Sequence, residues 1–466
     1  LTVWAKPDWP SDTGIMAEAG IVMDMDSGAI LYGQNIHLTY PPASITKILT
    51  ALIVLENCNL DDTVTFSTTA VNQVEADSGN KISVVAGDQL SVEDCLYSML
   101  LVSCNQAANA LAEHTAGSIS AFVNMMNEKL AQLGCQESHF ENPSGLNGDN
   151  QYVSAYDMAL IAQAAYDNET LVEISSATTH KIAPTTQNPD GFTIRGEHRL
   201  CVTEDPSSPY YYPEAVAGKT GYLIKAGNTL VTYAVKDNRR LISVILKGQP
   251  RQYFVDGKAL LEFGFRSFQD YTVADYESRY VTGNETINLD KGSFQASDLM
   301  IDPDSVITLP NSASFEDADI TLGALPEISP DNAVALLTYS YNDRTIGTAY
   351  LLAKDGVTID GNDSAAEAAT TAFDTANAEA PLATASNAEK PQRPHKHISV
   401  AGVLITILIV LLVLGVIGLI SWFIYSKKKE AKALAKRRER RRQRLQRSGD
   451  QEEFERLLAE YKNKKK

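Results

Sequence analysis

Residues 40–47 read Tyr-Pro-Pro-Ala-Ser-Ile-Thr-Lys, and from Lys47 to Leu55 the apolar positions repeat at the 3.6-residue spacing of a helix. We therefore predict that Ser44 opens a helix. Residues three apart share one helix face, so the amine of Lys47 is expected beside the hydroxyl of Ser44. Free N–H groups and a positive dipole at a helix start suit an oxyanion. Taken alone, however, the pattern fits an N-capping serine and a solvated lysine better.

The chain around this stretch, from about residue 15 to residue 265, mixes helical and strand patterns. Residues 92–113 and 119–133 have helical spacing, and residues 20–32 indicate a short hairpin. Residues 230–235 and 241–246 alternate like strands around a polar turn. We predict an α/β (α+β) domain here. From about 270 to 360, short β-type runs broken by Pro, Gly, Asp and Asn predict a small all-β domain.

Length and charge set the broad class of the protein. The chain has 466 residues, 44% of them hydrophobic, which is enough for two or three domains and excludes a wholly disordered chain. The net charge of −18 is the sum of two regions of opposite charge. Residues 426–466 are basic, with 17 Lys and Arg against 7 Asp and Glu, and the rest of the chain is acidic. The remaining acidic body would repel phosphates, so we expect no nucleic-acid binding.

Between the acidic body and the basic tail, residues 398–425 form a run of 28 without Asp, Glu, Lys, Arg or His. That length crosses a bilayer, and Trp422 and Tyr425 suit its interface. The lysines and arginines that follow predict a cytoplasmic tail and an extracytoplasmic body at the cell membrane. A buried core helix is the alternative. The chain begins at Leu1, so we expect that export used a signal peptide that is not present here.

Residues 361–397 contain 11 alanines among small polar residues and almost no large apolar side chain, which predicts a disordered stalk. The resulting organisation is a main domain at 1–268, a small β-rich domain at 269–360, the stalk, a transmembrane helix at 398–425 and a basic cytoplasmic tail at 426–466. Attraction to anionic lipid explains the tail, and a cytoplasmic partner for it is unknown. The sequence does not indicate an oligomeric state.

Two further motifs accompany Ser44 and Lys47. Ser103-Cys-Asn105 lies between two apolar helical runs, where polar residues suggest a turn that faces a pocket. Lys219-Thr-Gly221 leads into a strand-like segment. Short patterns of this kind also arise by accident, for example at Ser78–Lys81. Each of the two motifs alone also fits an ordinary helix–helix loop or an exposed strand start.

The three motifs in this order form the signature of penicillin-interacting serine enzymes. Their flanking residues strengthen the match: residues 90–97, 111–114, 142–146, 156–161 and 217–222. From about residue 15 to 265 the chain resembles the serine-type D-alanyl-D-alanine carboxypeptidases, which are low-molecular-mass penicillin-binding proteins. The resemblance implies a serine transpeptidase/β-lactamase-like domain, with helices packed on an antiparallel sheet, followed by a small all-β sandwich.

The resemblance and the chemistry together imply a role for each candidate residue. Ser44 is the expected nucleophile, Lys47 its base if its amine is neutral, and Ser103 the proton relay. The expected substrate-binding residues are Asn105, Lys219, Thr220, Gly221 and Tyr222. The implied substrate is a peptidoglycan stem peptide that ends in D-Ala-D-Ala, and β-lactams are the implied inhibitors. We expect no cofactor and no metal ion.

This chain departs from the family pattern at several positions. Gln106 and Leu223 stand where Asp and Thr are frequent, and His198 stands where Asn is common, so its role is open. Arg251 could add charge for a substrate carboxylate, although a solvated arginine is the plainer reading. The five cysteines are odd in number and without metal-ligand spacing, so no disulfide pairing is assigned.

Several functions remain open at this point. A serine β-lactamase shares the signature but needs a carboxylate for deacylation, and nothing marks Glu141 as that base. DD-endopeptidase activity is not separated from carboxypeptidase activity by the sequence. A catalytically inactive, membrane-anchored peptidoglycan-binding module is the third alternative, against which the intact motif residues argue.

Overall fold

The structure, a computed structural model, describes residues 6–75, 78–326 and 328–359. The predicted stalk, transmembrane helix and basic tail all lie outside these residues. Among the helices that are described, none has both the length and the apolar character needed to span a bilayer. The membrane assignment therefore stays a prediction.

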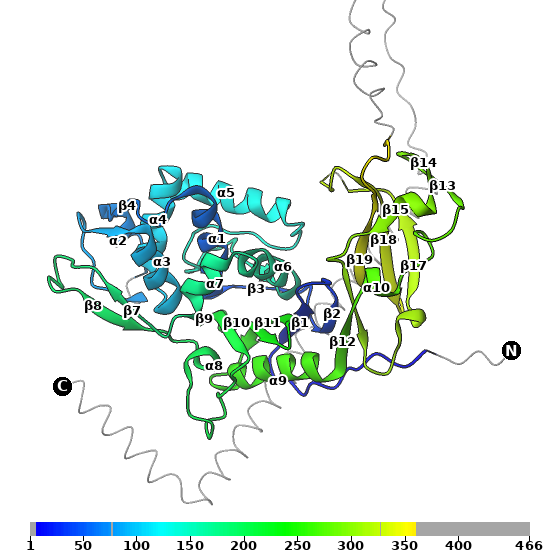
Figure 1. Cartoon of the computed structure of the whole chain (residues 1–466). Helices are drawn as coiled ribbons and strands as arrows, with labels where there is room; N and C mark the ends of the chain where they lie inside the picture. The colour runs from blue at the N-terminus through cyan, green and yellow to red at the C-terminus, as the bar shows by residue number, and fades with distance from the viewer. Residues whose placement is uncertain (1–5, 76–77, 327, 360–466) are drawn as a thin grey trace, which may run out of the picture. The chain divides into compact units, whose positions relative to one another are not determined.

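A five-stranded antiparallel sheet organises the first part of the chain (Figure 1). Its strand order is β2-β1-β11-β10-β9. The strands are β1 (Ala19–Asp24), β2 (Ile30–Gln34), β9 (Ala215–Leu223), β10 (Gly227–Lys236) and β11 (Arg239–Gly248). The predicted hairpins at 20–32 and 230–246 are confirmed, because β1 pairs with β2 and β10 with β11. Strand β9 forms one edge of this sheet.

Both faces of the sheet are buried, which explains the nearly continuous apolar runs of its central strands. Alternate side chains point to opposite faces of a strand. Val231 and Val244 accordingly belong to one core cluster with the helices before β9, whereas Leu230 and Ile245 pack with α9 (Gln252–Ser267). Figure 1 shows α9 on one side of the sheet and α6 on the other.

The helices on the side of α6 carry two of the three motifs. They are α1 (Lys47–Asn57), α2 (Thr68–Asn72), α3 (Val92–Leu101), α4 (Asn105–Ala116), α5 (Ile119–Gln132), α6 (Ala155–Tyr166) and α7 (Glu169–Ser176). Serine side chains cap several of them, as Ser91 does when it accepts from the backbone N–H of Asp94. Short two-stranded ribbons connect them: β3 (Thr39–Tyr40) with β6 (Val153–Ser154), β4 (Thr63–Thr65) with β5 (Gln89–Ser91), and β7 (Thr179–Ile182) with β8 (Phe192–Arg195). The short helix α8 (Arg199–Val202) precedes β9.

After α9 the described chain is mostly strand, as the sequence predicts for this region. The elements are β12 (Phe268–Thr272), α10 (Val273–Tyr276), β13 (Thr286–Leu289), β14 (Gly292–Gln295), β15 (Leu299–Ile301), β16 (Val306–Pro310), β17 (Asp319–Gly323), β18 (Ala333–Tyr341) and β19 (Arg344–Ala353). The largest of its sheets has the order β15-β19-β18-β17, and its buried side chains form a core cluster of their own.

Candidate active site

Ser44 lies in a 3₁₀ turn, η1 (Ala43–Thr46), and α1 begins at Lys47. The predicted helix start is therefore correct in position, although its first turn is 3₁₀ and not α-helical. Ala43 has a left-handed backbone with φ +52°. Gly145 packs directly against it, because a Cβ on Gly145 would lie 1.9 Å from the carbonyl oxygen of Ala43. A close backbone contact thus holds the turn that presents Ser44.

The side-chain nitrogen of Lys47 has three neighbours. Nζ lies 2.9 Å from Oγ of Ser44, 2.8 Å from Oδ1 of Asn105 and 2.5 Å from the backbone carbonyl oxygen of Ser144. Lys47 is fully buried. The predicted proximity of Ser44 and Lys47 is confirmed, and Asn105 of the second motif joins the same cluster.

These three contacts can be made by a neutral amine as well as by an ammonium group. The oxygens of Asn105 and Ser144 can only accept, so they take the two N–H donors of an NH₂ group. The remaining lone pair can then accept the hydroxyl proton of Ser44. Burial, and next the positive charge of Lys219, lower the pKa of Lys47 well below its ordinary value. The electrostatics therefore favour an uncharged Lys47, and the three contacts are compatible with it.

The second motif forms the turn between α3 and α4, as predicted. Ser103 has a left-handed backbone with φ +63°, and Asn105 is the first residue of α4. Ser103 and Asn105 line one cavity with Ser44. Cys104 between them is buried, and its thiol lies 3.6 Å from Oε1 of Gln106. The turn therefore directs its first and last residues to the cavity and its middle residue to the core.

The third motif lies on the edge strand β9. Lys219 is 2% exposed, and its Nζ donates to the carbonyl oxygen of Thr220 at 2.9 Å. Burial lowers the pKa of Lys219 to about 8, against the opposing effect of Glu197, so this lysine keeps its charge at neutral pH. Two buried lysines thus share the site, and burial lowers the pKa of both, that of Lys219 to about 8.

Gly221 lies where the third motif meets the first. A Cβ at this position would come within 2.8 Å of the backbone nitrogen of Ser44 and 2.3 Å of Oγ1 of Thr229. Thr229 in turn donates to the carbonyl oxygen of Pro42. The absence of a side chain at Gly221 is what allows β9 to approach the turn that carries Ser44.

The cavity at this junction has a volume of about 880 Å³. Its lining includes predicted residues of all three motifs, namely Ser44, Ser103, Asn105, Thr220, Gly221 and Tyr222. Lys47 and Lys219 are buried behind this lining. Within the described ranges, no group of three or more His, Cys, Asp or Glu side chains is arranged to hold a metal ion.

Several residues of the site were not predicted. The carbonyl of Ser144 could not be identified from the sequence, because a backbone group carries no residue signature, although 142–146 was marked as part of the resemblance. Lys81 and Glu197 form an ion pair of 3.1 Å among the lining residues, and Arg199 also lines the cavity. Gln106, a departure from the family pattern, donates to the carbonyl oxygen of Gly79.

Two uncertain residues can now be placed. Arg251 is exposed at the start of α9 and does not belong to the cavity lining. His198 is buried, and its Nε2 lies 3.1 Å from both the carbonyl oxygen of Val231 and Oγ1 of Thr232. Burial lowers the pKa of His198 to about 4, so it is a neutral packing residue beside β9. All five cysteines are free thiols.

Comparison with known proteins identifies the family. Residues 6–249 match the model of the D-alanyl-D-alanine carboxypeptidase family, Peptidase_S11. The chain is 34% identical over 265 residues to the D-alanyl-D-alanine carboxypeptidase DacB2 of Mycobacterium tuberculosis, which covers 56% of this chain and 84% of that protein. It is 31% identical over 354 residues to the D-alanyl-D-alanine carboxypeptidase DacA of Haemophilus influenzae. That match covers 72% of this chain and 84% of DacA. The chain belongs to the D-alanyl-D-alanine carboxypeptidase family.

Solved structures agree with this assignment. Penicillin-binding protein 5 of Haemophilus influenzae superposes with a TM-score of 0.56 at 25% identity, over 75% of this chain and 98% of that one. Penicillin-binding protein 6B of Escherichia coli has the same fold, with a TM-score of 0.55 at 23% identity. The superposition covers 75% of this chain and 99% of that one. The protein is accordingly a serine hydrolase with D-alanyl-D-alanine carboxypeptidase function, as the resemblance implied.

Proposed function

We propose that Ser44 forms the acyl-enzyme of a penicillin-sensitive carboxypeptidase that removes the terminal D-alanine from peptidoglycan pentapeptides. One observation carries this proposal: Nζ of Lys47 lies 2.9 Å from Oγ of Ser44 while its two other neighbours are obligate acceptors. A serine hydroxyl needs such a base before it can attack a carbonyl.

We assign a residue to each step of the reaction. The lone pair of Lys47 takes the hydroxyl proton as Oγ of Ser44 bonds to the carbonyl carbon of the penultimate D-alanine. The C–N bond to the terminal D-alanine then breaks, and Ser103 relays a proton to the departing amine. Water subsequently attacks the ester carbonyl, the serine oxygen leaves and recovers a proton, and the shortened peptide is released.

The substrate is held at both ends of the scissile bond. Lys219 supplies a cation for the terminal carboxylate and Thr220 a hydroxyl donor. The backbone N–H groups of Ser44 and Tyr222 form the oxyanion hole, and the close approach of Gly221 to the nitrogen of Ser44 supports this pairing. Asn105 both accepts from Lys47 and offers its amide N–H₂ to the substrate backbone.

The β-lactamase alternative gains no support from the geometry. Glu141 is exposed, and its Oε2 accepts from the backbone N–H of Asn150. It lines a neighbouring pocket and not the cavity that holds Ser44. The carboxylates that do line that cavity are bound to other residues, Glu75 to Asn147 and Glu197 to Lys81, so we favour a slowly released penicilloyl adduct.

We also propose that the catalytic domain works outside the cell membrane, anchored by one span at 398–425 with the basic tail in the cytoplasm. The support for this proposal is the apolar run and the positive charges that follow it. Peptidoglycan stem peptides are found on that side of the membrane. Protease treatment of intact cells that degrades the body but spares the tail would support this orientation, and the reverse result would refute it.

The catalytic proposal is tested with the full chain in two assays. Incubation with a pentapeptide that ends in D-Ala-D-Ala should release one D-alanine per peptide, and penicillin should block the release. A fluorescent penicillin should label the wild-type protein and leave Ser44→Ala unlabelled. Labelling without D-alanine release would exclude the carboxypeptidase, whereas an absence of labelling would favour the inactive binding module.

A further inference from the structure

A second pocket adjoins the catalytic cavity on the far side of the loop that carries Ser144. It has a volume of about 400 Å³, within the range of small-ligand sites. Glu75, Leu146 and Asn147 line both the pocket and the catalytic cavity. The two cavities are therefore neighbours with a common wall, although no step of the proposed reaction uses the second one.

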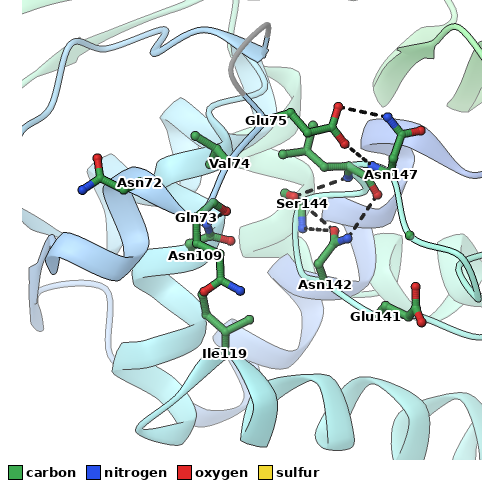
Figure 2. Close-up of a pocket in the computed structure, with 12 residues that line it drawn as sticks. Asn72, Gln73, Val74, Glu75, Asn109, Ile119, Glu141, Asn142, Ser144 and Asn147 are labelled. Atoms are coloured by element: carbon green, nitrogen blue, oxygen red, sulfur yellow. Dashed lines mark hydrogen bonds between the residues drawn. The ribbon is translucent and has the colours of Figure 1, made fainter.

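Side-chain amides dominate this pocket. Five of its lining residues carry a side-chain amide: Asn72, Gln73, Asn109, Asn142 and Asn147 (Figure 2). The apolar side chains of Val74 and Ile119 also line it. Asn142 and Asn147 already bond within the protein: Asn142 to the 144–146 turn, and Asn147 through Nδ2 to Glu75. Asn72 and Gln73 are exposed, and their side chains form no hydrogen bond with any described residue. Figure 2 shows the side chain of Asn72 directed away from the Ser144 loop, so Gln73 supplies the free amide nearest to the pocket.

Asn109 is the most informative of these residues. It is only 2% exposed, yet it lines the pocket. Its Nδ2 donates to the carbonyl oxygens of Ala70 and Gln73, whereas its Oδ1 has no partner among the described residues. The two bonds donated by Nδ2 hold the amide of Asn109 in place. Asn109 therefore offers a fixed acceptor to whatever enters.

The lining also defines the charge of its ligand. Its charged members are the carboxylates of Glu75 and Glu141, so an anion would be repelled. Both oxygens of Glu75 accept from Asn147, and Oε2 of Glu141 accepts from the backbone of Asn150. These bonds fix the carboxylates as part of the wall. The ligand that fits this lining best is neutral, both donates and accepts hydrogen bonds, and has a small apolar face to pack on Ile119.

We infer that this pocket binds an N-acetylated amino sugar of the glycan strand that bears the stem peptide. The acetamido N–H is donated to Oδ1 of Asn109, a hydroxyl group bonds to Gln73, and the acetyl methyl packs on Ile119. This inference rests on the proposed function. An extended pentapeptide spans about 17 Å, and the pocket shares a wall with the cavity that holds Ser44, so we infer that one molecule occupies both.

Direct binding is tested with N,N′-diacetylchitobiose, and cellobiose, which lacks the acetamido groups, is the control. Saturation-transfer NMR on the full chain should detect saturable binding of diacetylchitobiose and none of cellobiose. Gln73→Ala should weaken the binding about fivefold, the effect of one hydrogen bond, whereas the exposed Gln187→Ala outside the pocket should not. Equal binding of both sugars, or no binding, would overturn the inference.

A kinetic comparison separates this inference from the catalytic proposal. The ratio of kcat/KM for a disaccharide-linked pentapeptide to that for the free pentapeptide should exceed one in the wild type and fall in Gln73→Ala and Asn109→Leu. Fluorescent penicillin labelling of each sample reports a folded active site. Normal labelling with an unchanged ratio refutes the sugar site alone, and loss of labelling in the wild type refutes the catalytic proposal. Competition by an alkylamine in place of the sugar would identify a cation site and also overturn the inference.

Discussion

Oδ1 of Asn105 lies 2.8 Å from Nζ of Lys47, so a neutral acceptor from the second motif touches the base of the first. A carboxylate at the same position would favour a charged lysine. The neutrality of Asn105 is therefore part of what keeps Lys47 able to accept a proton.

The variant Asn105→Asp tests this relationship. The added negative charge should raise the pKa of Lys47 by at least about one unit, so acylation by penicillin at neutral pH should fall about tenfold or more. Activity should partly recover as the pH rises, because Lys47 then loses its proton. A pH profile of the acylation rate constant measures this shift. A uniform loss at every pH would mean that Asn105 acts only by contacting the substrate.

Deprotonation of Lys219 should set the alkaline limb of the pH profile of kcat/KM. Its pKa is lowered to about 8, so its charge is present below that pH and lost above it. Because kcat/KM reports the free enzyme, its value for a pentapeptide should decline above about pH 8. Lys219→Arg keeps a cation at high pH and should move the decline upward, even if the overall rate drops. A decline at the same pH in this variant would assign it to another group.

Gly221→Ala should impair acylation because of the contact between β9 and the Ser44 turn. The new Cβ would lie 2.8 Å from the nitrogen of Ser44, so the backbone has to shift where the oxyanion hole is proposed. Loss of one oxyanion donor typically costs about 100-fold or more in rate. Gly323→Ala is the matched control in a strand, since its Cβ meets only an ordinary contact at 3.8 Å. Near-wild-type acylation of Gly221→Ala would contradict this packing.

Asp256 should matter for stability and not for chemistry. This buried side chain of α9 accepts from the backbone N–H groups of Met16 and Ala17, which lead into β1. In Asp256→Ala these donors lose their partner, so the free energy of unfolding should fall by about 2–4 kcal/mol. Denaturant unfolding measures the change, with the exposed Glu262→Ala as control. A loss below about 0.5 kcal/mol would show that water replaces the carboxylate.

The sequence predicted the elements whose signal is local. Apolar spacing located α1 and α5, and alternation located β10 and β11, because each pattern depends on which face of its own element is buried. The contacts that complete the site are long-range, unlike these local patterns. The carbonyl of Ser144 reaches Lys47 through tertiary packing, and the ion pair of Lys81 and Glu197 joins segments more than 100 residues apart. Neither leaves a pattern in neighbouring residues.

The motif residues were found because their chemistry restricts residue type, and the order of the motifs narrowed the choice among accidental copies. Ser78 and Lys81, set aside as one such copy, nevertheless line the same cavity. Their position depends on how the loop before α3 folds over the site, which no local pattern predicts. The role of His198 was likewise open, since its neutral state depends on burial against β10.

The central claim is that Lys47 is uncharged when it meets Ser44. Its most direct test is an NMR titration of the ¹³Cε resonance of Lys47, assigned by comparison with Lys47→Arg, from about pH 5 to about pH 11 in the full chain. We expect a neutral amine at pH 7, with its transition well below that of a free lysine. A Lys47 that stays protonated up to about pH 10 would contradict it.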